Sequence, residues 1–246
     1  MLLSYREFIY ENDDSDVESD FNRKLAEKLI SELRRNSKLE SFSLSGMDFT
    51  EPYQFKLIVD VRHNAEFNIK TDEHFKQLPW EKFNFKRDGY AVDANTTVKG
   101  EETPEIEIVL VLDPTKEPHL YSKLHGRLLD ILTHETNHLS QLGINKDPTG
   151  EDVSDKDTRE EAKAGHKYFL LKDEVQSMVE GMYARSKHDD VPLDYVFNDY
   201  LIAFVKDKYI TKEEYADIME TWVKYAAEHY PDSKFSDKAN KVLNKL

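Results

Sequence analysis

Residues 118–142 read PHLYSKLHGRLLDILTHETNHLSQL, and they form a long segment with a regular apolar pattern. The apolar residues recur at intervals of three and four, which is the spacing of an amphipathic helix with one buried face. They are Leu124, Leu128, Ile131, Leu132, Leu139 and Leu142. Pro118 is typical of a first helical turn, and Gly143 is typical of the position after the last turn. The pattern therefore predicts one long helix between these two residues.

The last part of this helix carries the pentapeptide His134-Glu135-Thr136-Asn137-His138, which matches the pattern H-E-x-x-H. Two histidines four residues apart project from the same side of a helix, so their imidazoles can hold one zinc ion. Glu135 then lies beside the metal, where it can act as a general base. Glu135 and His138 also continue the apolar stripe, where an unpaired charge is costly to bury. The motif therefore predicts a Zn²⁺ site, while Asn137 faces away from the metal.

Two histidines do not complete such a site, because catalytic zinc usually takes three protein ligands and one water. One familiar scheme places a third histidine six residues after the second, but Ile144 occupies that position. A cysteine ligand is excluded because the chain contains no cysteine. A carboxylate from a later helix is the remaining common choice.

The helix expected at about 172–186 offers such a carboxylate. On its helical wheel, Glu174 borders the apolar arc, and the small residues Ser177 and Gly181 beside it leave room for another helix or a metal. A second glutamate, Glu180, falls on the polar face. We therefore expect Glu174 to be the third ligand. Glu180, His166 and an acidic residue elsewhere remain the alternatives.

Two side chains shortly before Glu174 are candidates for stabilising an oxyanion, because an imidazole or a phenol can donate a hydrogen bond to the developing charge. They are His166 and Tyr168. The other histidines have no partner at ligand spacing, and we interpret them as surface or ordinary packed residues. They are His63, His74, His119, His125, His188 and His229.

The order of the expected elements predicts an α+β fold, in which a mostly antiparallel sheet is followed by a helical half that carries the motif helix. A first helix is expected at about 17–35. Short alternating runs between about 40 and 113 predict strands. The runs lie at 55–61, 67–69, 83–85 and 105–112. The strand at 105–112 has the clearest alternation.

The second half of the chain is expected to be helical after the motif helix. The charged segment 145–160 predicts an exposed loop, and the further helices are expected at about 159–167, 172–186, 193–205, 211–229 and 232–246. We expect one domain spanning 1–246. Its N-terminal helix and sheet would occupy about 17–113, and its helical half about 118–246.

The composition excludes several classes of function. The chain has 246 residues and a formal net charge of -15, which argues against a nucleic-acid binder and against adsorption to anionic membranes. The absence of cysteine excludes disulfides and thiol catalysis. The N-terminus lacks an apolar segment of signal-peptide length, and no apolar run is long enough to span a bilayer. We therefore expect a cytoplasmic protein.

With these residues, the chain resembles the gluzincin-type zinc metallopeptidases over about 105–185. The matching residues are the motif at 134–138 and Glu174, and the strand at 105–112 fits the family plan of a strand that borders the cleft just before the motif helix. The opening SYREFIYE at 4–11 is similar to that of small proteins of T4-like tailed phages. One departure is the 35-residue separation of His138 from Glu174, which suggests an insertion at 145–160.

The resemblance implies a zinc-dependent hydrolase of peptide bonds with a peptide or protein substrate, located in the host cytoplasm if a phage encodes it. An extended substrate would pair with an edge strand, and we expect the strand at 105–112 to be that edge. One alternative is a non-enzymatic phage structural or host-interaction protein with a structural or vestigial zinc site. Another is a zinc hydrolase that acts on cell-wall peptides.

Overall fold

The structure is a computed structural model, and it describes residues 14–36, 41–49, 55–63, 75, 78–97, 103–117, 119–141 and 165–243. For 14–19, 41–49, 63, 140–141 and 242 it describes the backbone alone. Some expectations lie outside these residues. They are the strand at 67–69, the loop at 145–160, Gly143 at the helix end and most of the helix at 159–167.

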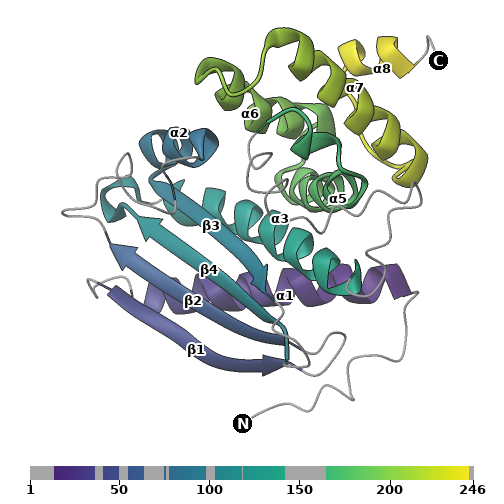
Figure 1. The fold of residues 1–246 in the computed structure, drawn as a ribbon. Helices are drawn as coiled ribbons and strands as arrows, with labels where there is room; N and C mark the ends of the chain where they lie inside the picture. The colour runs from purple at the N-terminus through teal and green to yellow at the C-terminus, as the bar shows by residue number, and fades with distance from the viewer. Residues whose placement is uncertain are drawn as a thin grey trace.

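A sheet precedes a series of helices, so the predicted α+β fold with a helical half is confirmed (Figure 1). The strands are β1 (Ser41–Phe49), β2 (Phe55–His63), β3 (Tyr90–Thr97) and β4 (Glu105–Leu112). The helices are α1 (Asp14–Arg35), α2 (Pro79–Asp88), α3 (His119–Gln141), α5 (Lys172–Asp189), α6 (Leu193–Lys206), α7 (Lys212–His229) and α8 (Asp237–Leu243). Two short 3₁₀ turns, η2 (Pro114–Lys116) and η3 (Tyr168–Leu170), precede α3 and α5.

The sheet has the strand order β1-β2-β4-β3. The outer pairs β1–β2 and β3–β4 are antiparallel, and the central pair β2–β4 is parallel. The sheet is therefore mostly antiparallel, as expected, but β4 is not its edge. The end of β4 is apolar on both faces, from Val109 to Leu112, and such strands lie inside a sheet. The expected edge strand at 105–112 was therefore wrong, and β3 is the edge nearest the motif helix.

Helices cover the two faces of the sheet unequally. α1 and α3 lie side by side against one face, where Leu29, Val59 and Leu110 are among the buried side chains of a large apolar cluster (Figure 1). The other face is covered at one end by α2, where Phe75, Ala91 and Val111 form a small cluster. The motif helix therefore packs directly on the sheet, close to β3.

The segment expected as a strand at 83–85 is part of helix α2. Pro79 begins this helix, and Gly89 ends it in the left-handed conformation at φ 85°, with its N–H bonded to two carbonyls of the last turn. A Cβ at Gly89 would lie 2.6 Å from Cγ of Lys116, so the position needs glycine. The sequence Phe83-Asn84-Phe85 is too short to distinguish the period of a strand from that of a helix, which explains the error.

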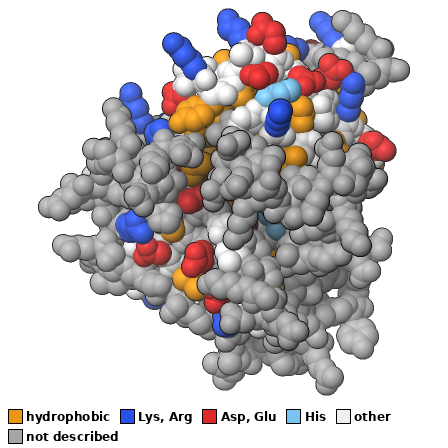
Figure 2. All heavy atoms as spheres, in the orientation of Figure 1, with side chains coloured by type: hydrophobic (Ala, Val, Ile, Leu, Met, Phe, Trp, Pro, Cys, Tyr) orange, Lys and Arg blue, Asp and Glu red, His pale blue; other side chains and the backbone are white. Residues whose placement is uncertain are grey.

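The helices α5, α6 and α7 begin and end within three residues of their predicted positions, whereas α8 begins at Asp237, five residues later than the helix expected at 232–246. Thr211 and Glu214 form the expected capping box of α7, in which each side chain bonds the backbone of the other residue. A second apolar cluster lies among α5, α6 and α7, around Trp222, and its indole N–H donates to the Phe169 carbonyl at 2.9 Å. Figure 2 shows acidic and basic side chains interspersed on the outer surface of this half.

The contact between α3 and α5 joins the two halves, and Gly181 lies at its closest point. A Cβ at Gly181 would lie 2.4 Å from the backbone oxygen of Asp130, a distance that only a shift of the helices could relieve. Ser177 is also fully buried in α5. Ser177 and Gly181, whose small size predicted room for another helix, thus lie where α5 crosses α3.

An added methyl group at Gly181 overpacks the crossing against backbone, which places its cost toward the upper end of the typical ~1–3 kcal/mol. Because alanine is favoured over glycine inside a helix by ~1 kcal/mol, we expect Gly181→Ala to destabilise the protein by a net ~1–2 kcal/mol. The free energy of unfolding, measured by urea denaturation, checks the expectation. Lys172→Ala, at an exposed position of the same helix, is the control and should change stability by less than ~0.5 kcal/mol. A Gly181→Ala protein as stable as the parent would contradict the close packing.

Candidate metal centre

Three of the predicted residues meet where the last turns of α3 face the first turn of α5. The Nε2 atoms of His134 and His138 lie 3.1 Å apart. The Glu174 carboxylate lies 3.7 Å from His134 Nε2 through Oε2 and 3.8 Å from His138 Nε2 through Oε1. Within the part of the chain that the structure describes, this is the single group of three potential ligands with donor atoms within 4.8 Å of one another.

The spacing of these donors fits a small tetrahedral cation. Zinc–ligand bonds of about 2.0–2.2 Å at tetrahedral angles separate neighbouring donor atoms by roughly 3.3–3.6 Å. The observed separations of 3.1, 3.7 and 3.8 Å are close to that range. Two imidazole nitrogens and one carboxylate oxygen are also a donor set found in catalytic zinc sites. The side chains present therefore fit zinc in both chemistry and spacing.

The imidazole of His134 is held in the form that a metal requires. Burial, together with the charges of His138 and Arg127, places the pKa of His134 well below its ordinary value, so the ring is neutral. The ring also hydrogen-bonds the backbone of Ser177 on α5. Metal-binding histidines are neutral, and a hydrogen bond of this kind fixes the orientation of the ring.

The Glu174 carboxylate is the most buried of the three donors, with 4% of its side chain exposed. Tyr168, in the turn η3, donates its hydroxyl to Glu174 Oε2 at 2.8 Å. A buried carboxylate is costly without such partners, so this hydrogen bond stabilises Glu174 and fixes its direction. Tyr168, which we expected as an oxyanion candidate, is thus positioned to orient the third donor.

Glu135 lies beside the histidines and points toward the sheet. Thr96 of β3 donates its hydroxyl to Glu135 Oε2 at 2.7 Å. Burial raises the pKa of Glu135 above its ordinary value, against the opposing influence of His138 and Thr96. A carboxylate with a raised pKa is a better proton acceptor than an exposed one. The pattern in the sequence did not reveal Thr96, because its role depends on β3 being the strand next to α3.

The structure places the two named alternatives to Glu174 elsewhere. Asn137 donates to Glu180 Oε2 at 2.5 Å, so Glu180 links the motif helix to α5 without joining the three donors. His166 Nε2 lies 2.6 Å from Asp217 Oδ2 of α7. Among the described residues, neither Glu180 nor His166 belongs to the metal-ligand group.

One end of the β3 edge is closed by α2. The Val92 N–H faces outward from the sheet, so it can donate to Glu81 Oε2, which lies 2.8 Å away. Glu81 also accepts from Arg127 of α3 at 2.9 Å, and Arg127 donates in turn to Asp130 at 2.7 Å. These hydrogen bonds connect α2 to both β3 and α3.

The buried Glu81 carboxylate is under-compensated in this arrangement. Burial raises the pKa of Glu81 from 4.5 to about 7, even though Arg127 and the Val92 N–H act in the opposite direction. Arg127 shares its single positive charge between Glu81 and Asp130, so it offsets only part of the cost of burying Glu81. Glu81 therefore titrates near neutral pH.

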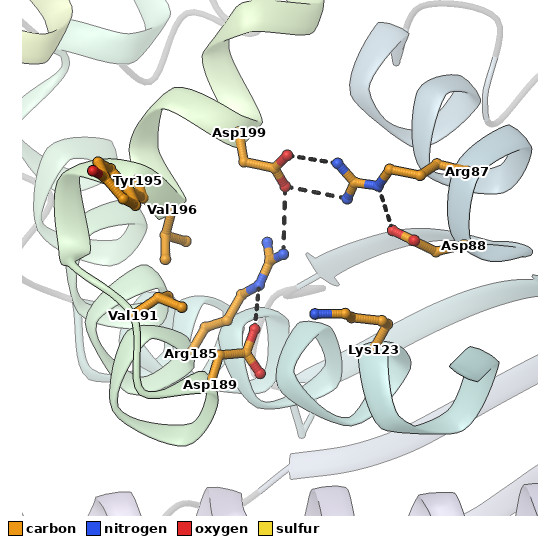
Figure 3. Close-up of a pocket in the computed structure, with 9 residues that line it drawn as sticks. All are labelled: Arg87, Asp88, Lys123, Arg185, Asp189, Val191, Tyr195, Val196 and Asp199. Atoms are coloured by element: carbon orange, nitrogen blue, oxygen red, sulfur yellow. Dashed lines mark hydrogen bonds and ion pairs between the residues drawn. The ribbon is translucent and has the colours of Figure 1, made fainter. Parts of the chain in front are cut away.

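A pocket of about 340 Å³ lies near the other end of α3 (Figure 3). Arg87 and Arg185 both contact Asp199 in its wall, where they form a charged network at the surface. Lys123, which also lines the pocket, precedes His134 by eleven residues, or roughly 16 Å along a helix. The pocket is therefore separate from the three donors.

No protein-family model, curated protein or solved structure matches this chain. None of the helices in the described segments is long and apolar enough to cross a membrane.

We expect Glu81→Gln to change how stability depends on pH. Folded wild-type protein keeps a proton on Glu81 up to about pH 7, whereas the unfolded chain releases it above about pH 4.5. Stability contributed by this group therefore falls as pH rises between these values, by up to ~1.4 kcal/mol per pH unit. Glutamine still accepts from Val92 but does not titrate, so the variant should gain stability relative to wild type from pH 5 to pH 7. Urea denaturation at several pH values measures this difference, and parallel curves for the two proteins would contradict it.

Proposed function

We propose that this protein is a zinc-dependent metallopeptidase that hydrolyses peptide bonds. The observation that supports the proposal is the meeting of His134, His138 and Glu174, with Glu135 beside them. In this proposal the first three side chains hold one zinc ion. A bound zinc ion supplies Lewis-acid activation of water and of the substrate carbonyl.

In this proposal Glu135 moves the proton. Its carboxylate removes a proton from the attacking water and later gives that proton to the leaving amine. Thr96 holds one carboxylate oxygen and thereby sets the direction of the group.

The remaining part of the β3 edge, with which no other strand of the described residues pairs, supports an extended peptide as the substrate. Outward-facing amides alternate along an antiparallel edge strand, so Ala94 and Thr96 follow Val92 on the outer edge. The Val92 N–H already donates to Glu81, so a further strand could pair only with the part of β3 near Glu135. Main-chain hydrogen bonds to Ala94 and Thr96 would place a substrate carbonyl next to the general base.

We expect Glu174→Gln to lose the tightly bound zinc and Glu180→Gln to keep it. The neutral amide of glutamine is a much poorer zinc ligand than a carboxylate, while Glu180 bonds Asn137 outside the donor group. The two substitutions are matched in chemistry and lie on the same helix. Zinc content after purification without chelator, measured by mass spectrometry, separates them. Equal zinc in both variants would exclude Glu174 as a ligand.

We expect Glu135→Gln to keep the zinc and the fold but to lose hydrolysis by at least ~10²–10⁴-fold, which is typical for removal of a general acid–base group. Cleavage of a diverse peptide library, followed by mass spectrometry, measures the loss, and zinc content and thermal unfolding are measured in parallel. If wild type and variant cleave equally, Glu135 is not the base. If wild type binds zinc and leaves every peptide intact, the result favours a structural zinc site in a non-enzymatic protein.

A further inference from the structure

A second pair of imidazoles meets between α3 and α5, away from the candidate metal centre. His188 Nε2 lies 3.3 Å from His125 Nδ1, and the ring centroids are 4.5 Å apart. On α3, His125 precedes His134 by nine residues, or roughly 14 Å along a helix. From the sequence we interpreted both residues as unpartnered, because they are 63 residues apart and only the helix crossing brings them together.

A carboxylate fixes one member of this pair. His188 Nδ1 lies 2.9 Å from Asp189 Oδ1, which places the proton of His188 on Nδ1. The lone pair of His188 therefore lies on Nε2, which faces His125. The other oxygen of Asp189 lies 3.7 Å from Arg185 Nε, so the carboxylate is held from two sides (Figure 3). A carboxylate behind a histidine is the arrangement that orients metal-binding imidazoles.

Helix α3 leaves space at Gly126 for the side chains of His188 and Asp189. A Cβ at Gly126 would lie 2.9 Å from Asp189 Oδ1 and 3.3 Å from His188 Nδ1. Glycine at this position thus lets the Asp189–His188 pair lie directly against α3, beside His125. Burial also lowers the pKa of His125, which keeps its ring neutral and able to donate a lone pair.

We propose that His125 Nδ1 and His188 Nε2 bind a second divalent transition-metal ion, more weakly than the three-donor centre. Their separation of 3.3 Å matches the roughly 3.3–3.6 Å between neighbouring donors of a tetrahedral ion. Imidazole ligands select Zn²⁺, Ni²⁺ and Cu²⁺ over Ca²⁺ and Mg²⁺. Water completes the coordination. Glu27 of the adjacent α1 and Asp189 act on His125 as negative charges, and Arg34 of α1 acts on it as a positive charge. The ion bridges α3 and α5, so binding also stabilises their crossing.

This inference is independent of the proposed peptidase function, and its test uses Ni²⁺ as the probe. The chelator-treated full-length His134→Gln/His138→Gln protein, which lacks the motif histidines, is titrated with Ni²⁺ in a calorimeter. We expect one bound Ni²⁺ per chain. Adding His188→Gln should weaken binding at least tenfold, and adding His119→Gln, an exposed histidine of α3, should leave binding unchanged. As a second measurement in the otherwise unaltered chain, His188→Gln should remove one of two Ni²⁺ equivalents.

The role of Asp189 has its own control. Asp189→Asn keeps both imidazoles and should weaken Ni²⁺ binding by about 10–100-fold, as is typical when the partner of a metal-binding histidine is removed. Asp190→Asn changes the adjacent exposed carboxylate and should have no effect on binding. Circular dichroism verifies the fold of each variant. Absence of Ni²⁺ binding in the double variant, or equal binding with and without His188, overturns the proposal and leaves an ordinary hydrogen bond between His125 and His188.

Discussion

The close packing of α3 against α5 is the contact on which the rest of the site depends. At Gly181 the backbone of α5 comes so near Asp130 that no side chain fits between the two helices. This approach brings Glu174 to the two motif histidines, although 35 residues separate it from His138 in the sequence. The same crossing brings His188 to His125. One steric constraint therefore assembles both groups of donors.

The face of α5 toward α3 carries polar or small residues, whereas its other face is apolar. Glu174, Ser177, Gly181 and Arg185 are buried along one stripe. Val175, Val179 and Met182 pack into the apolar cluster of the helical half. Burying a polar stripe is favourable only when its groups find partners, and here histidines, Tyr168 and aspartates supply them. The stripe thus supports specific polar contacts while the opposite face supplies apolar stabilisation.

Much of this arrangement follows from the sequence, for identifiable physical reasons. The period of the long helices, the alternation at 105–112 and the capping box of α7 are local patterns, and the structure has all of them. The assembly of His134, His138 and Glu174 was predictable because helical spacing and small neighbours are also local signals. The strand expected at 83–85 was wrong, since two aromatic residues cannot define a period and the glycine cap decides the outcome.

The sequence does not reveal the order of the strands, nor the contacts between distant residues that this order creates. β4 lies between β2 and β3, so the edge beside the motif helix is β3. Thr96 reaches Glu135 only because of that order, and Glu81 reaches the Val92 amide for the same reason. Neither pair has a spacing that a helical wheel or an alternation pattern reveals, because each depends on a nonlocal contact.

The uneven burial of the three donors bears on the direction from which a substrate would approach. The Glu174 side chain is 4% exposed and held by Tyr168, whereas His134 and His138 are 13% and 19% exposed. In the proposed zinc site, the carboxylate therefore forms the closed side and the imidazoles the side nearer solvent. Glu135 borders the imidazoles and is tied to the β3 edge through Thr96. A peptide pairing with Ala94 and Thr96 would thus reach the imidazole side of the proposed site, where Glu135 is placed to accept a proton.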